Sequence, residues 1–212
     1  MQGMLVTVEG VEGSGKSTQC KRLTELLRSR GLDVVLTREP DGTAMGAALR
    51  RLFEADGPPP APLAQVFLFM AARQQHIATV IRPALSRGAV VLSDRYADAT
   101  MAYQGYGLGV DLDTIRDLNA LATGGLTPDL TLLLDLDPAV GMARIRDRRL
   151  DAFEKMDLTF HRRVRDGYLE IARTEKRRIV VLDAAQHPDP LFASIESAVG
   201  DRLLNREGLR AH

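Results

Sequence analysis

Five short apolar runs recur along the chain, and they constrain its fold more than any other feature. They are rich in β-branched residues and apolar throughout, which is typical of strands buried on both faces of a parallel sheet. Longer segments with helical periodicity separate them. This alternation predicts an α/β doubly wound fold with right-handed crossovers. The runs span Met4–Glu9, Asp33–Arg38, Ala89–Asp94, Leu130–Asp135 and Arg178–Asp183.

Two stretches between these runs carry further expectations. Residues 63–85 are mostly apolar and predict a long helix, which Pro83 is expected to end or bend. Within that helix, Phe67 is expected to be a core residue. The Pro-rich stretch Asp56–Pro62 predicts a loop between two helices, and the sequence shows neither a domain linker nor an internal repeat.

Length and composition are those of an ordinary globular protein. A chain of 212 residues, 45% hydrophobic and 26% charged, suits one domain with a substantial core, so we expect residues 1–212 to form a single domain. Lys plus Arg equals Asp plus Glu at 28 each, which gives no support to a general nucleic-acid-binding surface. No apolar run is long enough to cross a bilayer. We therefore expect neither a nucleic-acid partner nor a membrane partner.

Cysteine and histidine usage predicts the compartment and argues against a zinc site. The single cysteine, Cys20, excludes an internal disulfide and fits a reducing cytosol, with a buried, inert thiol as the favoured interpretation. The four histidines show no metal-ligand spacing. The N-terminus lacks the basic start and cleavage site of a signal peptide. These features predict a cytoplasmic protein.

The stretch GVEGSGKST matches the P-loop pattern in full, follows a predicted strand and opens a predicted helix. Its glycines let main-chain N–H groups surround a phosphate, and the helix beginning near Lys16 directs its positive dipole end at the same anion. Lys16 is expected to reach the β- and γ-phosphates, Ser17 to hold Mg²⁺ and Thr18 to approach the α-phosphate. The residues predicted to bind the nucleotide are Gly10, Val11, Glu12, Gly13, Ser14, Gly15, Lys16, Ser17 and Thr18.

A P-loop indicates a nucleotide but does not indicate the chemistry. GTPases, motors and small-molecule kinases share it, and this chain has no guanine-reading Asn-Lys-x-Asp segment and no long coupling domain. Three interpretations stay open at this point: a kinase for a nucleotide or nucleoside, a regulatory module that binds nucleotide without transferring phosphate, and a Gly-rich turn that binds nothing. A second anion site facing the loop would favour the kinase.

Further segments follow the P-loop in a specific order: TREPDGT, FLFMAAR, SDRYADATMAYQG, PDLTLLLDLDP and FHRRVRDGYLEIA. Together they resemble the thymidylate kinase family over nearly the whole chain. The resemblance implies a P-loop kinase fold with a five-stranded parallel sheet. It also implies transfer of the γ-phosphoryl group of ATP to dTMP with Mg²⁺, which supplies dTDP for DNA synthesis, and a homodimer. A kinase for another nucleoside monophosphate or for a deoxynucleoside is the nearest alternative.

The resemblance also implies an acceptor site at the C-terminal ends of the strands, where ligands of open α/β sheets bind. Arg38 and Arg95 would hold the acceptor phosphate, since a guanidinium fork matches phosphate bidentately. The alternative for Arg38 is a surface ion pair with Glu39. Asp94 would hold Mg²⁺ or its waters, or face the acceptor hydroxyl, and a strand-end ion pair with an arginine is its alternative. Asp41 stands where a glycine is usual and adds negative charge near this phosphate.

The same resemblance assigns the rest of the acceptor. Phe69 and Arg73 lie four apart on one helix face, and they would stack on thymine and bond its carbonyl edge. Thr100 and Gln104 would face the remaining edges of the base. Tyr103 would pack under the deoxyribose and leave no room for a 2′-hydroxyl. For Phe69 and Tyr103 the alternative is ordinary helix packing.

Two features of the sequence concern the charge on the transferring phosphate. The family either carries an arginine inside the P-loop, where this chain has Gly13, or supplies arginines from a lid over ATP. This chain resembles the second, bacterial type, with a lid at about residues 144–155 and Arg148 or Arg149 meeting the phosphate. Ala152 stands where the family usually has an arginine, so the charge on the transferring phosphate would have to be neutralised by Arg148 or Arg149 instead.

Glu12 places a carboxylate inside an anion-binding loop. While the loop N–H groups face the donor, this side chain can point toward the acceptor and orient Arg95, a lid arginine or the water shell of Mg²⁺. A solvent-exposed Glu12 is the alternative. It is not predicted to be a base, because the attacking phosphate oxygen is already deprotonated near neutral pH. The predicted catalytic residues are Lys16, Arg95, Glu12, Arg148 and Arg149.

Overall fold

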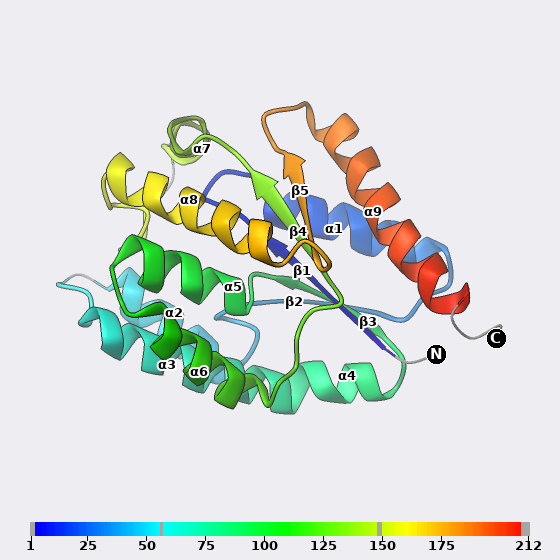
Figure 1. Ribbon diagram of the computed structural model, residues 1–212, viewed down its shortest axis with the longest axis horizontal. Coiled ribbons are helices and arrows are strands. Elements are labelled where there is room, and N and C mark those ends of the chain that lie inside the picture. Colours follow the sequence, from blue (N-terminus) through cyan, green and yellow to red (C-terminus); the bar gives the residue numbers. More distant parts are fainter. Residues whose placement is uncertain (1–2, 56, 148–149, 209–212) are drawn as a thin grey trace.

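The computed structural model describes residues 3–55, 57–147 and 150–208, with side chains up to residue 203. Its centre is a five-stranded parallel sheet in the order β2-β3-β1-β4-β5 (Figure 1). Each predicted run forms a strand, and the doubly wound α/β prediction is confirmed. The strands are β1 Met4–Glu9, β2 Val34–Arg38, β3 Val90–Asp94, β4 Leu130–Asp135 and β5 Ile179–Asp183.

Helical segments cover both faces of the sheet (Figure 1). Helix α1 packs against β2 and β3, α9 against β4 and β5, and α8 lies over β4, β5 and η2. No helix among the residues described is long and apolar enough to cross a membrane. The helical segments are α1 Lys16–Ser29, α2 Ala44–Glu54, α3 Pro62–His76, η1 Ile77–Ile81, α4 Arg82–Ser86, α5 Ala97–Thr100, η2 Met101–Gly107, α6 Leu112–Thr123, α7 Pro138–Ile145, α8 Leu158–Thr174 and α9 Pro188–Gly208.

The inner and edge strands differ in burial. Strands β1 and β3 are buried along their whole length, and alternate residues of β1 contribute to different core clusters, Val8 with the α1 side and Leu5 with the η1 side. The edge strands depart from the expectation of burial on both faces. Leu36 of β2 is 38% exposed and Val181 of β5 is 45% exposed, because an edge strand has a neighbour on one side only and receives less helix cover.

The long helix predicted at residues 63–85 forms, but Pro83 does not end it. Helix α3 runs into the π-helical segment η1 and then into α4, which carries Pro83 at its second position and continues to Ser86. Proline lacks an N–H and collides with the carbonyl of the preceding turn, and the widened π turn just before it accommodates both effects.

The expectation that Phe67 is a core residue was wrong. Its side chain is 54% exposed, beside Leu63 at 45%. Val66 is fully buried and marks the inner face of α3, and the next residue lies about 100° further around the helix. Periodicity located the helix but did not show which apolar residues would have neighbours.

The sheet places three chain segments at one edge. Val8 of β1 and Arg38 of β2 are both register partners of Asp94 in β3, so the C-terminal ends of these strands lie side by side. The loop at residues 10–15 leaves this edge and leads into α1. The residues expected to bind two anions therefore start from adjacent strand ends.

Candidate active site

The loop between β1 and α1 has the conformation of an anion-binding loop. Gly10, Gly13 and Gly15 adopt φ values of 140°, 69° and 91°, which side-chain-bearing residues rarely reach. Within the part of the chain that the structure describes, the main-chain N–H groups of residues 12–15 donate no hydrogen bond to protein. The first turn of α1 adds its own unpaired N–H groups and its dipole. This arrangement suits a bound phosphate.

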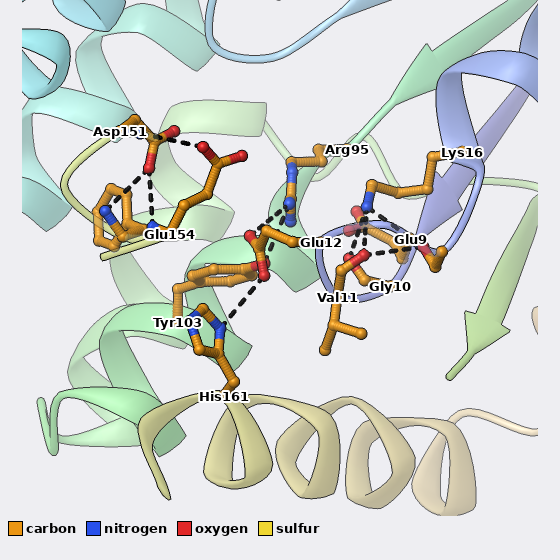
Figure 2. Close-up of polar contacts among 12 residues, drawn as sticks. Glu9, Gly10, Val11, Glu12, Lys16, Arg95, Tyr103, Asp151, Glu154 and His161 are labelled. Carbon is orange, nitrogen blue, oxygen red and sulfur yellow. Dashed lines mark hydrogen bonds and ion pairs between the residues drawn. The ribbon is translucent and has the colours of Figure 1, made fainter. Parts of the chain in front are cut away.

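Lys16 folds back into this loop (Figure 2). Its Nζ donates to the carbonyl oxygens of Gly10 at 2.9 Å and Val11 at 2.7 Å. Burial, and then the charge of Arg95, lower the pKa of Lys16 to about 8. The ammonium is thus held at the loop by weak carbonyl acceptors, and a polyphosphate would be a stronger partner. Thr18, on the first turn of the same helix, is exposed.

The outer side of the loop rests directly on α7. A Cβ built on Gly13 would lie 2.2 Å from the carbonyl oxygen of Gly141, and one built on Gly141 would lie 2.2 Å from the carbonyl oxygen of Glu12. Arg144 of α7 donates to the carbonyl oxygens of Gly13 at 3.1 Å and Ala184 at 3.3 Å. The main chain of the loop is therefore in direct contact with the main chain of α7, and position 13 has no room for a side chain in this backbone.

Ser17 and Asp94 lie together at the mouth of the loop. The Ser17 hydroxyl donates to Asp94 Oδ2 at 2.6 Å. Among the described residues Asp94 forms no ion pair, so the alternative of a strand-end salt bridge is not seen. A hydroxyl and a carboxylate are oxygen ligands that suit Mg²⁺, which keeps several waters and binds substrate phosphates. The described residues contain no cluster of three or more His, Cys, Asp or Glu that could hold a metal by themselves.

A cavity of about 110 Å³ lies next to this loop and reaches it at Glu12 and Asp94. All the side chains expected to bind the acceptor line it, although they come from β2, α3, the end of β3, α5 and η2. The structure therefore brings these residues together, while the role of each remains a prediction. They are Arg38, Phe69, Arg73, Arg95, Thr100, Tyr103 and Gln104.

Arg95 lies between the cavity, which we name the acceptor cavity after its expected ligand, and the loop at residues 10–15, which we name the donor loop (Figure 2). Its Nη2 donates to Glu12 Oε1 at 3.1 Å and to the Tyr103 hydroxyl at 3.0 Å, and its guanidinium lies 4.8 Å from the centre of the Tyr103 ring. Its Nη1 donates to the Tyr168 hydroxyl at 3.3 Å. The Arg95 guanidinium is thus held between Glu12 of the loop and Tyr103 of the cavity wall.

Glu12 is buried rather than solvent-exposed, and its carboxylate points toward the acceptor cavity. It accepts hydrogen bonds from Arg95 and Tyr103, and its Oε2 lies 3.3 Å from Nδ1 of His161 (Figure 2). Burial alone would raise the pKa of Glu12, but His161, Arg95 and Lys16 together hold it well below the usual range. Glu12 is therefore an anion throughout the physiological pH range.

His161 and Tyr168 were not singled out from the sequence. Both lie on α8, seven residues apart, which places them on the same helix face. Both are buried and face the polar groups around Arg95. That spacing of a histidine and a tyrosine within FHRRVRDGY was the only signal that could have found them.

The base-reading pair predicted on α3 is already engaged within the protein. Arg73 is buried, and it donates to Glu39 at 2.9 Å, to Asn119 at 2.7 Å and to the hydroxyl of Thr100 at 3.1 Å. The ring of Phe69 stacks on Phe53 with centroids 5.2 Å apart. To contact a base, this guanidinium must share or exchange its partners.

Arg38 does not pair with Glu39, which bonds Arg73 instead. The Nε of Arg38 lies 2.9 Å from the carboxylate of Asp41, and the same carboxylate lies 3.8 Å from Arg50 on α2. Arg50 lines the acceptor cavity and was missed by the sequence reading. Asp41 thus sits between two arginines of the cavity wall.

The segment predicted as a lid contributes to the acceptor cavity. Asp151 and Phe153 line it, and the Phe153 ring lies 5.8 Å from that of Tyr103. The main-chain N–H of Ala152 donates to the Phe53 carbonyl at 3.1 Å, which ties this segment to α2. The arginines at positions 148 and 149 lie outside the described residues.

Two further predictions concern side chains beside these sites. Gln104 is buried and its amide donates to Gln65 at 3.1 Å, so it too has a protein partner at the cavity wall. Cys20 is buried, as expected, and burial raises the pKa of its thiol well above the usual value. This thiol is therefore protonated and unreactive at neutral pH.

Comparisons with known proteins agree with this geometry. The family model described as thymidylate kinase matches residues 8–195. A thymidylate kinase of Deinococcus radiodurans is 49% identical over 95% of this chain and 98% of its own length, and one of an Exiguobacterium species is 51% identical over 88% and 89%. A crystal structure of thymidylate kinase from Ehrlichia chaffeensis superposes with a TM-score of 0.79 at 32% identity, over 94% of this chain and 100% of that one. The chain therefore belongs to the thymidylate kinase family.

Proposed function

We propose that this protein transfers the γ-phosphoryl group of ATP to dTMP, giving dTDP for DNA synthesis. The observation that carries the proposal is the placement of an anion-binding loop and an acceptor cavity on either side of Glu12 and Arg95. A protein that only senses a nucleotide has no use for a second arginine-lined cavity beside the loop. Family membership supports the same assignment.

On the donor side, the main-chain N–H groups of residues 12–15 and Lys16 would hold the phosphates of ATP. Ser17 and Asp94 would hold Mg²⁺, which when bound supplies neutralising charge for the transferring group. Glu12 is not needed as a base. Its role would be to hold Arg95, so that the guanidinium stays between the phosphates of ATP and the phosphate of dTMP.

On the acceptor side, Arg38 and Arg95 would bind the dTMP phosphate, and Arg50 lines the same cavity. Phe69 would stack on thymine with Arg73 at the carbonyl edge. Thr100 and Gln104 would face the remaining edges of the base. Tyr103, which is held by Glu12 and packs close to Phe153, would bound the sugar and disfavour a 2′-hydroxyl.

An ADP-release assay across monophosphates tests the proposal. Turnover with dTMP should exceed that with dUMP, dCMP and dGMP, and ATP alone should give little ADP, because the transferring group needs an aligned acceptor. Turnover with none of the four would favour a nucleotide-binding regulatory module. Faster turnover with dCMP or dGMP than with dTMP would move the assignment to another monophosphate kinase.

We further propose that residues 1–212 act as one cytoplasmic catalytic domain with a lid at about residues 144–155. The contact of Ala152 with α2 and the position of Phe153 at the acceptor cavity support a segment that covers the site. Arg148 and Arg149 remain the proposed source of the lid charge. Closure would exclude water and prevent wasteful hydrolysis of ATP.

We propose a homodimer formed through the outer faces of α3 and α6. These helices pack against each other, and they expose Leu63, Phe67 and Leu121 at 45%, 54% and 79%. Large apolar side chains exposed on two helices that pack together favour a protein partner. Sedimentation should give twice the mass of the chain, and Phe67→Glu should give the monomer mass. A monomer in the unmodified protein would contradict the proposal.

A further inference from the structure

Glu9 is a buried carboxyl group that neither the motif nor the proposed mechanism uses. It is the last residue of β1, directly before Gly10 of the donor loop, and it is 0% exposed. Its Oε1 accepts a hydrogen bond from the main-chain N–H of Tyr96 at 2.7 Å, and its Oε2 accepts one from the Tyr168 hydroxyl at 2.8 Å. It does not line the acceptor cavity. Both partners are neighbours of Arg95: Tyr96 follows it in the chain, and Tyr168 bonds its side chain.

The first connection from Glu9 to Arg95 runs through the main chain. Arg95 has a φ of 73°, the one positive value among the non-glycine residues that the structure describes. This left-handed conformation is sterically unfavourable for a residue with a Cβ, so the surroundings must hold it. The Arg95 N–H donates to the Val8 carbonyl at 3.0 Å, the Arg95 carbonyl accepts from Ser93 at 2.7 Å, and the following N–H is bound by Glu9.

The second connection runs through the side chains. Nη1 of Arg95 donates to the Tyr168 hydroxyl at 3.3 Å, and that hydroxyl donates in turn to Glu9. The other end of the guanidinium, Nη2, faces Glu12 and Tyr103. The direction of the guanidinium is therefore set from behind by Tyr168 and Glu9 and from the front by the donor loop.

We propose that Glu9 is a positioning residue that fixes Arg95 relative to the donor loop, through the Tyr96 N–H and the Tyr168 hydroxyl. Because Glu9 immediately precedes Gly10, the same strand end carries the donor loop and holds the acceptor-side arginine. Glu9 thereby sets the spacing between the two phosphates without touching either. The inference rests on the proposed phosphoryl transfer and adds a residue to it.

The surroundings of Glu9 suit this role. Burial, and then the charge of Asp98, raise the pKa of Glu9 to about 8, while Arg95, the Tyr168 hydroxyl and the Tyr96 N–H act in the opposite direction. Lys16 also interacts electrostatically with the Glu9 carboxyl group. In its protonated form this carboxyl group keeps Oε1 as the acceptor for the Tyr96 N–H, and its proton on Oε2 lies in the contact with the Tyr168 hydroxyl. It can then orient Arg95 through both partners without drawing the arginine's charge out of the cavity. Glutamine is then the conservative replacement, because it is neutral and keeps an oxygen for the Tyr96 N–H.

The test compares kcat and KM for dTMP and for ATP at pH 7 in three variants. Glu9→Leu removes both contacts, and kcat/KM for dTMP should fall at least about thirtyfold while KM for ATP stays within about threefold. Tyr168→Phe removes only the side-chain connection and should lower the same constant about tenfold. Glu9→Gln should restore activity to within about threefold of the unmodified enzyme.

Thr7→Val is the matched control for Tyr168→Phe. It removes one buried hydroxyl from the same strand as Glu9, the one bonded to Thr131 at 2.8 Å, and it leaves Arg95 untouched. Its kinetic constants should stay within about twofold of the unmodified enzyme, even if its melting temperature falls as far as that of Tyr168→Phe.

Two outcomes are distinguishable failures. An unmodified enzyme that turns over dTMP, together with Glu9→Leu and Tyr168→Phe variants that match Thr7→Val, overturns the role of Glu9 alone. If Glu9→Leu fails to fold, Tyr168→Phe and Glu9→Gln decide by the same comparison. An unmodified enzyme that releases no ADP with dTMP overturns the proposed function and this inference with it.

Discussion

The donor loop and the acceptor cavity are neighbours built from different parts of the chain. The loop is one short segment in which main-chain N–H groups are proposed to bind the anion, and its shape depends on three glycines with positive φ. The cavity collects side chains from distant segments, and its arginines already bond partners within the protein, Arg73 with Glu39 and Arg38 with Asp41. Among the described residues, the N–H groups of residues 12–15 have no protein partner to give up, whereas the arginines of the cavity, like Lys16 in the loop, must first exchange partners.

Lys16→Ala tests the donor half of this contrast and should have the largest effect. Removing the only side-chain cation of the loop should lower kcat by about a thousandfold or more, because phosphoryl transfer depends on alignment and charge neutralisation. Its melting temperature should stay close to that of the unmodified protein, since the loop shape comes from glycines. Turnover that survives the change would remove the P-loop assignment.

Two carboxylates three residues apart should show opposite pH dependence of stability. The pKa of Glu9 is raised from 4.5 to about 8, so its contribution is fully present below about pH 4.5 and is lost as pH rises toward 8. The pKa of Glu12 is lowered, so its contribution is present above pH 4.5 and is lost as pH falls further. Relative to Glu9→Gln, the unmodified protein should lose on the order of a few kcal/mol of unfolding free energy between pH 5 and pH 8.

Relative to Glu12→Gln, the same protein should instead lose stability on acidification below about pH 4.5. Urea unfolding of both variants and the unmodified protein across this pH range measures the two slopes. Slopes of the same sign would mean that the two side chains share one environment, against the geometry.

Phe69→Ala tests the acceptor half. The substitution removes the ring proposed to stack on thymine and should raise KM for dTMP by about thirtyfold, with KM for ATP within about threefold. Phe192→Ala on α9 is the matched control: it removes a partly buried ring that does not line the cavity and should leave both constants unchanged. An equal rise in both constants for Phe69→Ala would mean that the ring supports the fold rather than the base.

Asp41→Gly should give the smallest effect and sharpens the idea of partner exchange. Arg38 is half-exposed, so its ion pair with Asp41 is worth at most about 1 kcal/mol. Releasing it should lower KM for dTMP by up to about fivefold and leave KM for ATP unchanged. A higher KM for dTMP would show that Asp41 orients Arg38 more than it competes with the phosphate.

The sequence predicted most of the fold and the position of the glycine loop between β1 and α1, because both depend on local patterns. Apolar runs located the strands to within a residue, and the loop motif contains all its own binding groups. Contacts between segments that are far apart in the sequence were harder to predict. Nothing local could show that Glu39 pairs with Arg73 rather than Arg38, or that Arg50 on a separate helix reaches the cavity.

The failures have the same physical origin. Phe67 was misplaced because helical periodicity does not say which face will meet a neighbour. Leu36 was expected to be buried because an apolar run does not distinguish an inner strand from an edge strand. Glu9 went unnoticed because its partners, Tyr96 and Tyr168, come from segments remote in sequence.

The contact between Gly13 and Gly141 limits how this enzyme could change over evolutionary time. An arginine introduced at position 13 would collide with the backbone of α7, so a lineage with this packing cannot place a cation in the loop by a single mutation. It would first have to move α7 away from the loop. A loop arginine is therefore separated from this sequence by at least two changes rather than by a single codon.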